Sequence, residues 1–364
     1  MNHPIRLVTL IFLLLAPATM ASPADAQRIE KKWQVTIDQW SLETRVATTP
    51  DARAKVWSAR PDPTPFVKQM WETIGSSLND EWSLEPAAWF LRIGSDLVTT
   101  QPNGSSAPAF AKEIDAIRKA LESHHLKSLK LIPICMALAA THDPRSLAVL
   151  EKIQALNPDK KTQGVAALGA AMILKTLGDD PQLMRKRLTC LRVAIIQSSE
   201  VTLDGTTVAK LAQDELYIIQ FLTKGRVAPD LCGTDSAGLP LKLSDHKGKV
   251  IVLLFWSSTT TEAQHVVQIT TQWVQKFHDR PLVVIGVNND PLEKLRALEA
   301  DSTVTWKNLS DPSNKLSSDY RVGTWPLVYV LDGERKIHYA GAPGSFAELT
   351  AEALLSEIQP ASHE

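Results

Sequence analysis

The sequence predicts two domains of different class, an α-helical domain over residues 27–222 and an α/β domain over residues 226–361. Three observations lead to this division. The chain has 364 residues, which exceeds the usual length of one domain. Before residue 222, apolar residues recur at helical spacing. After Gly225, short apolar runs alternate with helical stretches, which is typical of βαβ units around a largely parallel sheet.

Residues 1–26 have the pattern of a secretory signal peptide. Arg6 precedes a short apolar run over residues 7–15, and small residues follow around Ala21 and Ala26. We expect cleavage after Ala26 or Ala21. The run is too short to span a bilayer, although an uncleaved N-terminal membrane anchor is the alternative. We therefore expect an exported chain, periplasmic or secreted, with no membrane insertion after processing.

The region from 27 to 222 carries repeated helix starts. Asp143-Pro144 and Asp180-Pro181 each offer an N-cap carboxylate followed by proline in the first turn. The two starts lie about 37 residues apart, which is within the range of helix-pair repeats. The sequence thus predicts either a HEAT-like or TPR-like repeat or an irregular helical bundle.

Charge and cysteine content exclude several function classes. The formal net charge is -1, so electrostatics gives no reason to expect nucleic acid or an anionic membrane as partner. Three widely spaced cysteines, Cys135, Cys190 and Cys232, fit neither a disulfide framework nor a metal site. We expect no metal and no cofactor.

The α/β region contains four strand-like runs, two intervening helices and a closing hairpin. The hairpin is indicated by Asp332-Gly333, and a last helix follows it over residues 346–358. The expected strands cover residues 250–256, 282–288, 327–331 and 336–340, and the helices between them cover residues 262–277 and 292–300.

Several short motifs in this region are shared with one known superfamily. They are Ala228-Pro229-Asp230, Lys247-Gly248-Lys249-Val250, Phe255-Trp256, Gly286-Val287-Asn288 and Trp325-Pro326. With them, residues 226–361 resemble the TlpA-like and AhpC/TSA (redoxin) branch of the thioredoxin superfamily. The resemblance implies a thioredoxin fold, with a central mixed sheet flanked by helices, and thiol-disulfide oxidoreductase or peroxiredoxin-like chemistry.

The resemblance also implies that this chemistry is lost. The two active cysteines of the family fall on Thr260 and Ala263. Threonine forms no stable anion near neutral pH and alanine has no nucleophile, so disulfide exchange by this route is excluded. Pro326 matches the family's cis-proline, whose loop pairs with an extended peptide through main-chain groups. The residues expected to border a peptide groove are Trp256, Thr259, Thr260, Thr261, Glu262, Trp325 and Pro326.

The predicted function is therefore non-covalent binding of an extracytoplasmic protein or peptide by a pseudo-oxidoreductase. Two alternatives stay open. Thiol-disulfide or antioxidant activity is retained through Cys232, or the domain is a structural module of an exported assembly. Whether the chain is an enzyme is left undecided, and the oligomeric state is not predicted.

Overall fold

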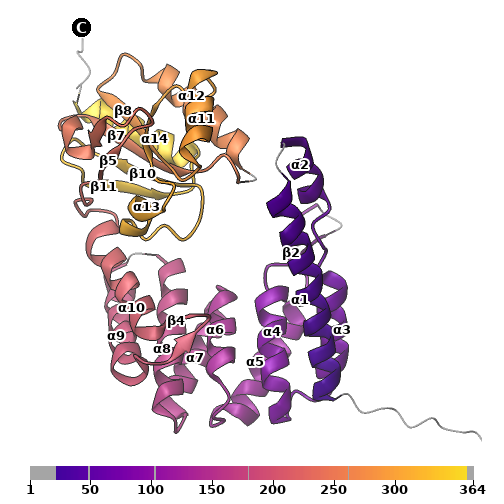
Figure 1. Cartoon of the computed structure of the whole chain (residues 1–364). Helices are drawn as coiled ribbons and strands as arrows, with labels where there is room; N and C mark the ends of the chain where they lie inside the picture. The colour runs from indigo at the N-terminus through magenta and orange to yellow at the C-terminus, as the bar shows by residue number, and fades with distance from the viewer. Residues whose placement is uncertain (1–21, 48–49, 102–103, 179, 261, 359–364) are drawn as a thin grey trace, which may run out of the picture. The chain divides into compact units, whose positions relative to one another are not determined.

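The computed structural model describes residues 22–47, 50–101, 104–178, 180–260 and 262–358. The chain forms two compact units, Met1–Ala209 and Lys210–Glu364. Figure 1 shows the helices of the first unit and the sheet of the second. No helix among the described residues is long and apolar enough to cross a membrane.

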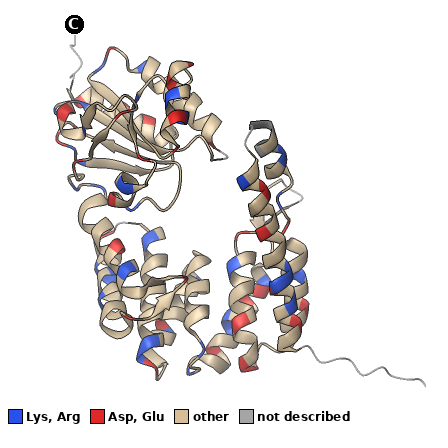
Figure 2. Ribbon diagram, in the orientation of Figure 1, with Lys and Arg blue, Asp and Glu red and all other residues tan. Residues whose placement is uncertain are grey.

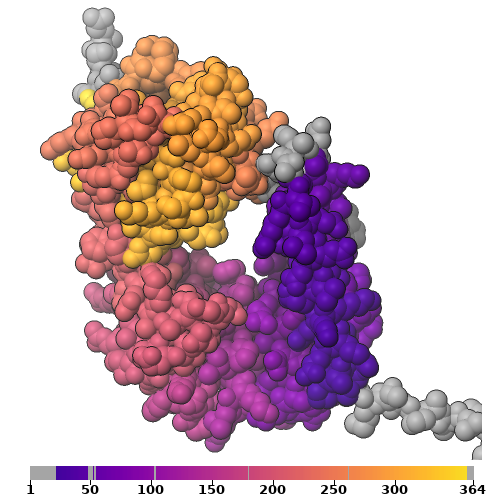
Figure 3. All heavy atoms as spheres, viewed as in Figure 1, coloured from indigo at the N-terminus to yellow at the C-terminus, as the bar shows by residue number. Residues whose placement is uncertain are grey.

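The N-terminal unit is built mainly from helices joined by short turns, and its atoms run from indigo to pink in the space-filling view (Figure 3). Its elements are α1 (Pro23–Val46), α2 (Pro50–Ser58), α3 (Thr64–Ile74), η1 (Glu81–Ser83), α4 (Leu84–Gly94), β1 (Val98–Thr100), β2 (Ser106–Pro108), α5 (Ala111–Ala120), the π-helix η2 (Leu121–His125), α6 (Ile132–Ala140), α7 (Pro144–Leu156), α8 (Lys160–Thr176), α9 (Pro181–Ser198), β3 (Thr202–Leu203) and β4 (Thr206–Thr207).

Aspartate side chains cap three consecutive helices of this unit. Asp143 accepts a hydrogen bond from the Arg145 amide at the start of α7, and Asp180 accepts from Gln182 and Leu183 at the start of α9. Both predicted Asp-Pro helix starts are thus confirmed. Asp159 caps α8 in the same way, although no proline follows it. Whether these helices form a repeat stays a prediction.

A buried guanidinium ties α5 to α7. The side chain of Arg118 is 6% exposed and contacts Asp115, Asp143 and Ser146, with distances of 2.6, 3.1 and 3.0 Å. A buried charge is tolerated only when it is paired and hydrogen-bonded. Arg118 meets both conditions, because two carboxylates balance its charge and a hydroxyl accepts a further hydrogen bond.

The C-terminal unit is organised around a five-stranded mixed sheet of order β11-β10-β7-β8-β9. β7 pairs in parallel with β8 and antiparallel with β10, and β8 pairs in parallel with β9. The elements are α10 (Val208–Tyr217, which begins just before this unit), the π-helix η3 (Ile218–Leu222), β5 (Cys232–Thr234), β6 (Pro240–Lys242), η4 (Leu243–His246), β7 (Val250–Trp256), α11 (Ala263–Lys276), β8 (Leu282–Asn288), α12 (Leu292–Ala300), β9 (Lys307–Ser310), α13 (Lys315–Asp319), β10 (Leu327–Leu331), β11 (Ile337–Gly341) and α14 (Ser345–Ile358).

Alternate residues of β7 face two different apolar cores. Val252 and Leu254 pack in a core with Trp273 of α11 and Leu354 of α14. Leu253 packs on the other face, in a core that also contains residues of η3, the β5–β6 hairpin and α13. β7, β8 and β10 carry no charged side chain and appear tan in Figure 2. Burial on both faces explains why these strands read as continuous apolar runs.

The structure confirms most of the predicted elements and corrects a few. The strands expected at 250–256, 282–288 and 327–331 have those bounds, and β11 lies one residue later than expected. β9 and α13 were not predicted, because each is only four or five residues long and carries polar residues. In the N-terminal unit, β1 and β2 pair as a small antiparallel hairpin.

Candidate functional site

The candidate site is the loop that joins β7 to α11, at the carboxyl ends of the parallel strands. This edge is where ligands bind in open α/β sheets. Thr259 is exposed, Thr260 is half-buried and Glu262 is exposed as the N-cap residue of α11. Ala263 is the first residue of that helix. Thr261, also predicted to line the groove, lies outside the residues that the structure describes.

A buried carboxylate at the end of the neighbouring strand β8 accepts hydrogen bonds from this loop. Asp290 is 2% exposed and follows β8. It accepts hydrogen bonds from the Ser257 hydroxyl at 2.6 Å, from the Ser258 amide at 2.9 Å and from the Asn288 side-chain amide at 3.0 Å. The Ser257 hydroxyl in turn accepts from the Thr259 amide at 3.2 Å. The path of the loop is therefore fixed by side chains that lie beneath it.

Sequence reasoning missed Asp290 and Asn288 as residues that shape the site. The available signal was positional, because polar residues follow two neighbouring parallel strands, Ser257 after β7 and Asp290 after β8. The carboxyl ends of neighbouring parallel strands lie at the same edge of a sheet, so these side chains could be expected to lie close together.

The opposite wall of the site is the turn before β10. The Trp325–Pro326 peptide bond is cis. Because Leu327 pairs with Phe255, the antiparallel register brings this turn alongside the end of β7. Trp325 is half-buried, and its ring lies 6.4 Å from that of Phe255, edge to face. The amides of Gly323, Thr324 and Trp325 have no hydrogen-bond acceptor among the described residues.

Trp256 does not border this groove, and the prediction that it does is wrong. Its side chain is 0% exposed, and its indole N–H donates to Asn308 at 2.9 Å inside the core. Alternation along β7 places it on the face covered by α11 and α14, whereas Phe255 faces the Trp325 side.

Nothing in the described surroundings activates Thr260 as a nucleophile. Its hydroxyl donates to the Ser257 carbonyl at 3.2 Å, which is a contact internal to the turn. His265 is exposed, and no described hydrogen bond or ion pair joins it to Thr260. A hydroxyl nucleophile needs an adjacent base, which this arrangement lacks.

The three cysteines lie in different environments. Cys135 and Cys190 are buried, and burial raises the pKa of both thiols. Cys232 is exposed on β5, opposite Lys242 of β6, so it lies on the small hairpin and not on the loop after β7. The described residues contain no cluster of three or more His, Cys, Asp or Glu side chains that would hold a metal ion.

An arginine anchors the turn to α10. The Arg321 Nε donates to Asp214 at 2.7 Å, its guanidinium lies 4.1 Å from the centre of the Tyr217 ring, and it also donates to the Ser318 carbonyl at 2.7 Å. Arg321 precedes Pro326 by five residues, so these contacts hold the segment that leads into the cis-proline turn. No motif in the sequence indicates this role.

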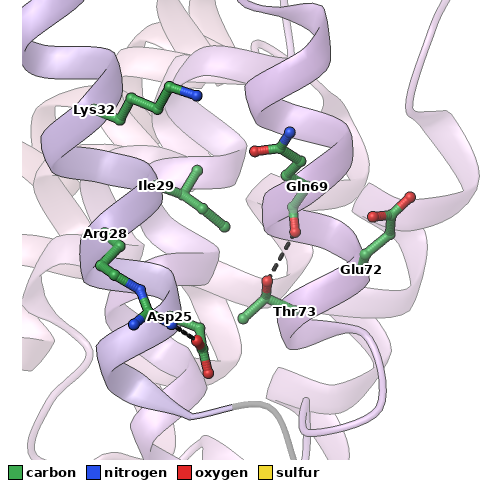
Figure 4. Close-up of a pocket in the computed structure, with 7 residues that line it drawn as sticks. All are labelled: Asp25, Arg28, Ile29, Lys32, Gln69, Glu72 and Thr73. Carbon is green, nitrogen blue, oxygen red and sulfur yellow. Dashed lines mark hydrogen bonds and ion pairs between the residues drawn. The ribbon is translucent and has the colours of Figure 1, made fainter. Parts of the chain in front are cut away.

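A hollow of about 470 Å³ also lies between α1 and α3 in the N-terminal unit (Figure 4). Arg28 and Lys32 of α1 line it with Glu72 of α3, and Arg28 forms an ion pair with Asp25. The Lys32 ammonium lies 5.8 Å from the centre of the Phe66 ring. Its charges of both signs define no single ligand chemistry.

Comparison with known proteins agrees with the C-terminal fold. The model of the AhpC/TSA family matches residues 224–340. The chain is 28% identical over 115 residues to the thioredoxin-like protein YneN of Bacillus subtilis, which covers 30% of this chain and 66% of YneN. The C-terminal region is a thioredoxin-like redoxin domain. The N-terminal unit lies outside the family match.

Other relatives match over the same region. The chain is 25% identical to the protein DipZ of Mycobacterium tuberculosis, over 36% of this chain and 21% of DipZ. It is 22% identical to the thiol-disulfide oxidoreductase ResA of Bacillus anthracis, over 42% of this chain and 87% of ResA. The chain thus spans about a fifth of DipZ and just under two thirds of YneN.

Two solved structures of thiol-disulfide proteins are also similar to part of this chain. The thioredoxin domain of a thiol-disulfide oxidoreductase from Bacteroides vulgatus is 25% identical, with a TM-score of 0.33 over 36% of this chain and 98% of that domain. A putative thiol:disulfide interchange protein DsbE from Chlorobium tepidum is 24% identical, with a TM-score of 0.34 over 37% of this chain and 98% of that one.

Proposed function

We propose that the redoxin domain binds an extended protein or peptide segment without covalent chemistry, in the groove between Thr259–Glu262 and Trp325–Pro326. The observation that carries the proposal is the free backbone at Gly323, Thr324 and Trp325. Exposed amides beside a strand end can pair with an added strand, in which main-chain hydrogen bonds supply affinity. Trp325 adds apolar contact area next to these amides.

The absence of a thiol at the loop supports binding in place of electron transfer. The relatives are named for thiol-disulfide exchange, whereas this chain has Thr260 and Ala263 at the start of α11. A helix N-terminus stabilises a thiolate, but it has no thiol to act on here. The scaffold of the loop is nevertheless intact, since Asp290 accepts hydrogen bonds from Ser257 and Ser258 of the loop.

The redox part of the proposal is tested by insulin-disulfide reduction with dithiothreitol. We expect the wild-type chain to be silent and the Thr260→Cys, Ala263→Cys double variant to be active, because the helix N-terminus then carries a thiolate and a resolving thiol. Wild-type activity would show that disulfide exchange persists and would contradict the proposal.

The binding part is tested by fluorescence anisotropy, with fluorescein-labelled, cysteine-alkylated insulin B chain as an extended probe. We expect binding by the wild type and a loss of about ten-fold for Trp325→Ala, the size of effect typical of a buried aromatic anchor. Leu239→Ala, an exposed leucine in the turn between β5 and β6, is the control and should bind as the wild type does. Equal binding by both variants would remove Trp325 from the groove.

Retained thiol activity through Cys232 is a second candidate, and the exposure of that side chain favours it. A lone exposed thiol can attack a partner's disulfide, which forms a mixed disulfide and releases the partner's other cysteine as a thiol. Activity in the insulin assay that disappears in Cys232→Ser would establish this function. If neither binding nor redox activity is found, the domain acts as a structural module of a larger assembly.

Export is proposed on the pattern in residues 1–26, most of which lie outside the described residues. Ser22 caps α1, and its amide and hydroxyl donate to Asp25 at 3.0 and 2.6 Å. Ala26 is buried. Cleavage after Ala21 keeps this cap, whereas cleavage after Ala26 removes it. Intact-mass analysis of the exported chain should therefore give Ser22 as the first residue, and Gln27 would contradict this choice.

A further inference from the structure

A second cavity lies in the redoxin domain, at the end of β8 away from the groove. It has a volume of about 320 Å³ and is lined by the first residues of β8, by the segment that leads into β9 and by the C-terminal end of α11 with the two residues after it. β8 rises about 20 Å over its seven residues, so the cavity and the Asp290 loop are separate sites. The inference below goes beyond the proposed peptide groove and does not depend on it.

The cavity exists because β9 is shorter than β8. Pairing between the two strands begins at Ile285 and Lys307, so the first three residues of β8 have no neighbour in β9. The chain at Thr305 and Trp306 lines the resulting gap, together with Leu282 and Val284 of β8.

The walls of the cavity are apolar. Phe277, Val284 and Trp306 line it and are at most 5% exposed, and Val274 and Leu282 complete this surface. Its volume is at the small end of the range for ligand pockets, which are mostly apolar with a few polar groups that fix orientation.

One polar group in these walls has no partner. The indole N–H of Trp306 is buried, and no hydrogen-bond acceptor for it is found among the described residues. A buried donor without an acceptor is costly and unusual in a native structure. Trp256, which contacts Trp306 ring to ring at 5.6 Å, has its own indole N–H satisfied by Asn308.

One cationic side chain at the rim of the cavity is unpaired. Lys307 is exposed, lines the cavity and has no ion-pair partner within the described part of the chain. His278 is also at the rim and lies 2.7 Å from Asp279.

We propose that this cavity binds a small amphiphilic carboxylate, with its alkyl chain against Phe277, Val284 and Trp306 and its carboxylate at Lys307. The apolar walls match the chain and the unpaired ammonium matches the head group.

The proposal is tested by titrating the full chain, labelled with ¹⁵N at its tryptophan indoles, with hexanoate and octanoate below their micelle concentrations. The Trp306 resonance, assigned by its absence in Trp306→Phe, should shift because the Trp306 ring lines the cavity, while those of Trp256 and Trp273, which do not line it, should move less. Each further buried methylene should tighten binding about four-fold.

Two controls identify the role of charge. Lys307→Gln should weaken octanoate binding about two- to five-fold, as expected for one partly exposed ion pair. Lys336→Gln, an exposed lysine beside the opposite edge strand β11, should leave it unchanged. Octyltrimethylammonium should not bind.

The proposal is overturned if octanoate leaves the Trp306 resonance in place, or if the cationic amphiphile binds as well as octanoate does. It is equally overturned if Lys307→Gln binds like the wild type. Should Trp306→Phe fail to fold, the wild-type titration and Lys307→Gln decide the matter alone, because Lys307 is exposed and outside the core.

Discussion

Replacing Asp290 by alanine should destabilise the redoxin domain more than any surface change. The substitution removes the carboxylate acceptor from three donors, the Ser257 hydroxyl, the Ser258 amide and the Asn288 side-chain amide. The Ser257 hydroxyl keeps contact with the Thr259 hydroxyl at 2.8 Å, and Asn288 keeps a long bond of 3.4 Å to the Trp256 carbonyl. Each unsatisfied buried donor costs about 1 to 3 kcal/mol. Ser258 is half-buried, so water compensates part of the loss, and we expect about 3 to 5 kcal/mol in total. Asp290→Asn keeps one acceptor oxygen and should cost less.

Native-state hydrogen exchange of the amides in β7 measures this change in the full chain, because buried central strands exchange through global opening of their unit. A loss of 3 kcal/mol accelerates exchange roughly 150-fold, since 1.4 kcal/mol is a factor of ten. Asp245→Ala, an exposed aspartate in η4, is the matched control and should change stability by less than about 0.5 kcal/mol. A cost below about 1 kcal/mol for Asp290→Ala would refute the claim that Asp290 holds the loop.

Two further predictions concern the N-terminal unit. Asp143→Asn should lower the free energy of unfolding by about 2 kcal/mol at pH 7, because it removes a negatively charged partner of the buried Arg118 guanidinium. Partial burial acts to raise the pKa of Asp143, but hydrogen bonds and cationic charge from the neighbouring arginines outweigh it and lower the pKa below 3.8. The stabilisation of the fold by the Asp143 carboxylate is therefore complete above pH 3.8 and is lost as the pH falls through the folded-state pKa. In urea unfolding, the difference in free energy of unfolding between the wild type and Asp143→Asn should shrink below pH 3.8. In α8, a Cβ at Gly164 would lie 1.9 Å from the Ser198 hydroxyl, so Gly164→Ala should lower thermal stability by about 1 to 3 kcal/mol despite the better helix propensity of alanine. An unchanged melting temperature would contradict this.

The central sheet could be predicted from the sequence because its strands are buried on both faces. β7, β8 and β10 are continuous apolar runs, and their bounds follow directly from where those runs end. β9 is different, since it is an edge strand of four residues that contains Lys307 and Asn308. Such a segment owes its conformation to pairing with β8, which no local pattern reveals.

The site divides in the same way. The loop after β7 and the turn at Pro326 were identified from motifs, whereas Asp290 and Arg321 were not. Their roles depend on contacts with residues 33 and 107 positions away, which are Ser257 and Asp214. Trp256 was misassigned for a related reason. Trp256 directly precedes the loop in the sequence, but adjacent residues of a strand face opposite sides of the sheet, and its side chain faces the side away from Trp325.

The hydrogen bonds of Asp290 separate the shape of the site loop from the chemistry at its tip. The carboxylate fixes Ser257 and Ser258 and leaves Thr260 and Ala263 outside its set of contacts. Substitutions at these two positions can therefore change what the loop does without changing where it runs. A lineage built on such a scaffold can lose a redox pair, or regain one, in two substitutions, while Asp290 continues to hold Ser257 and Ser258 in place.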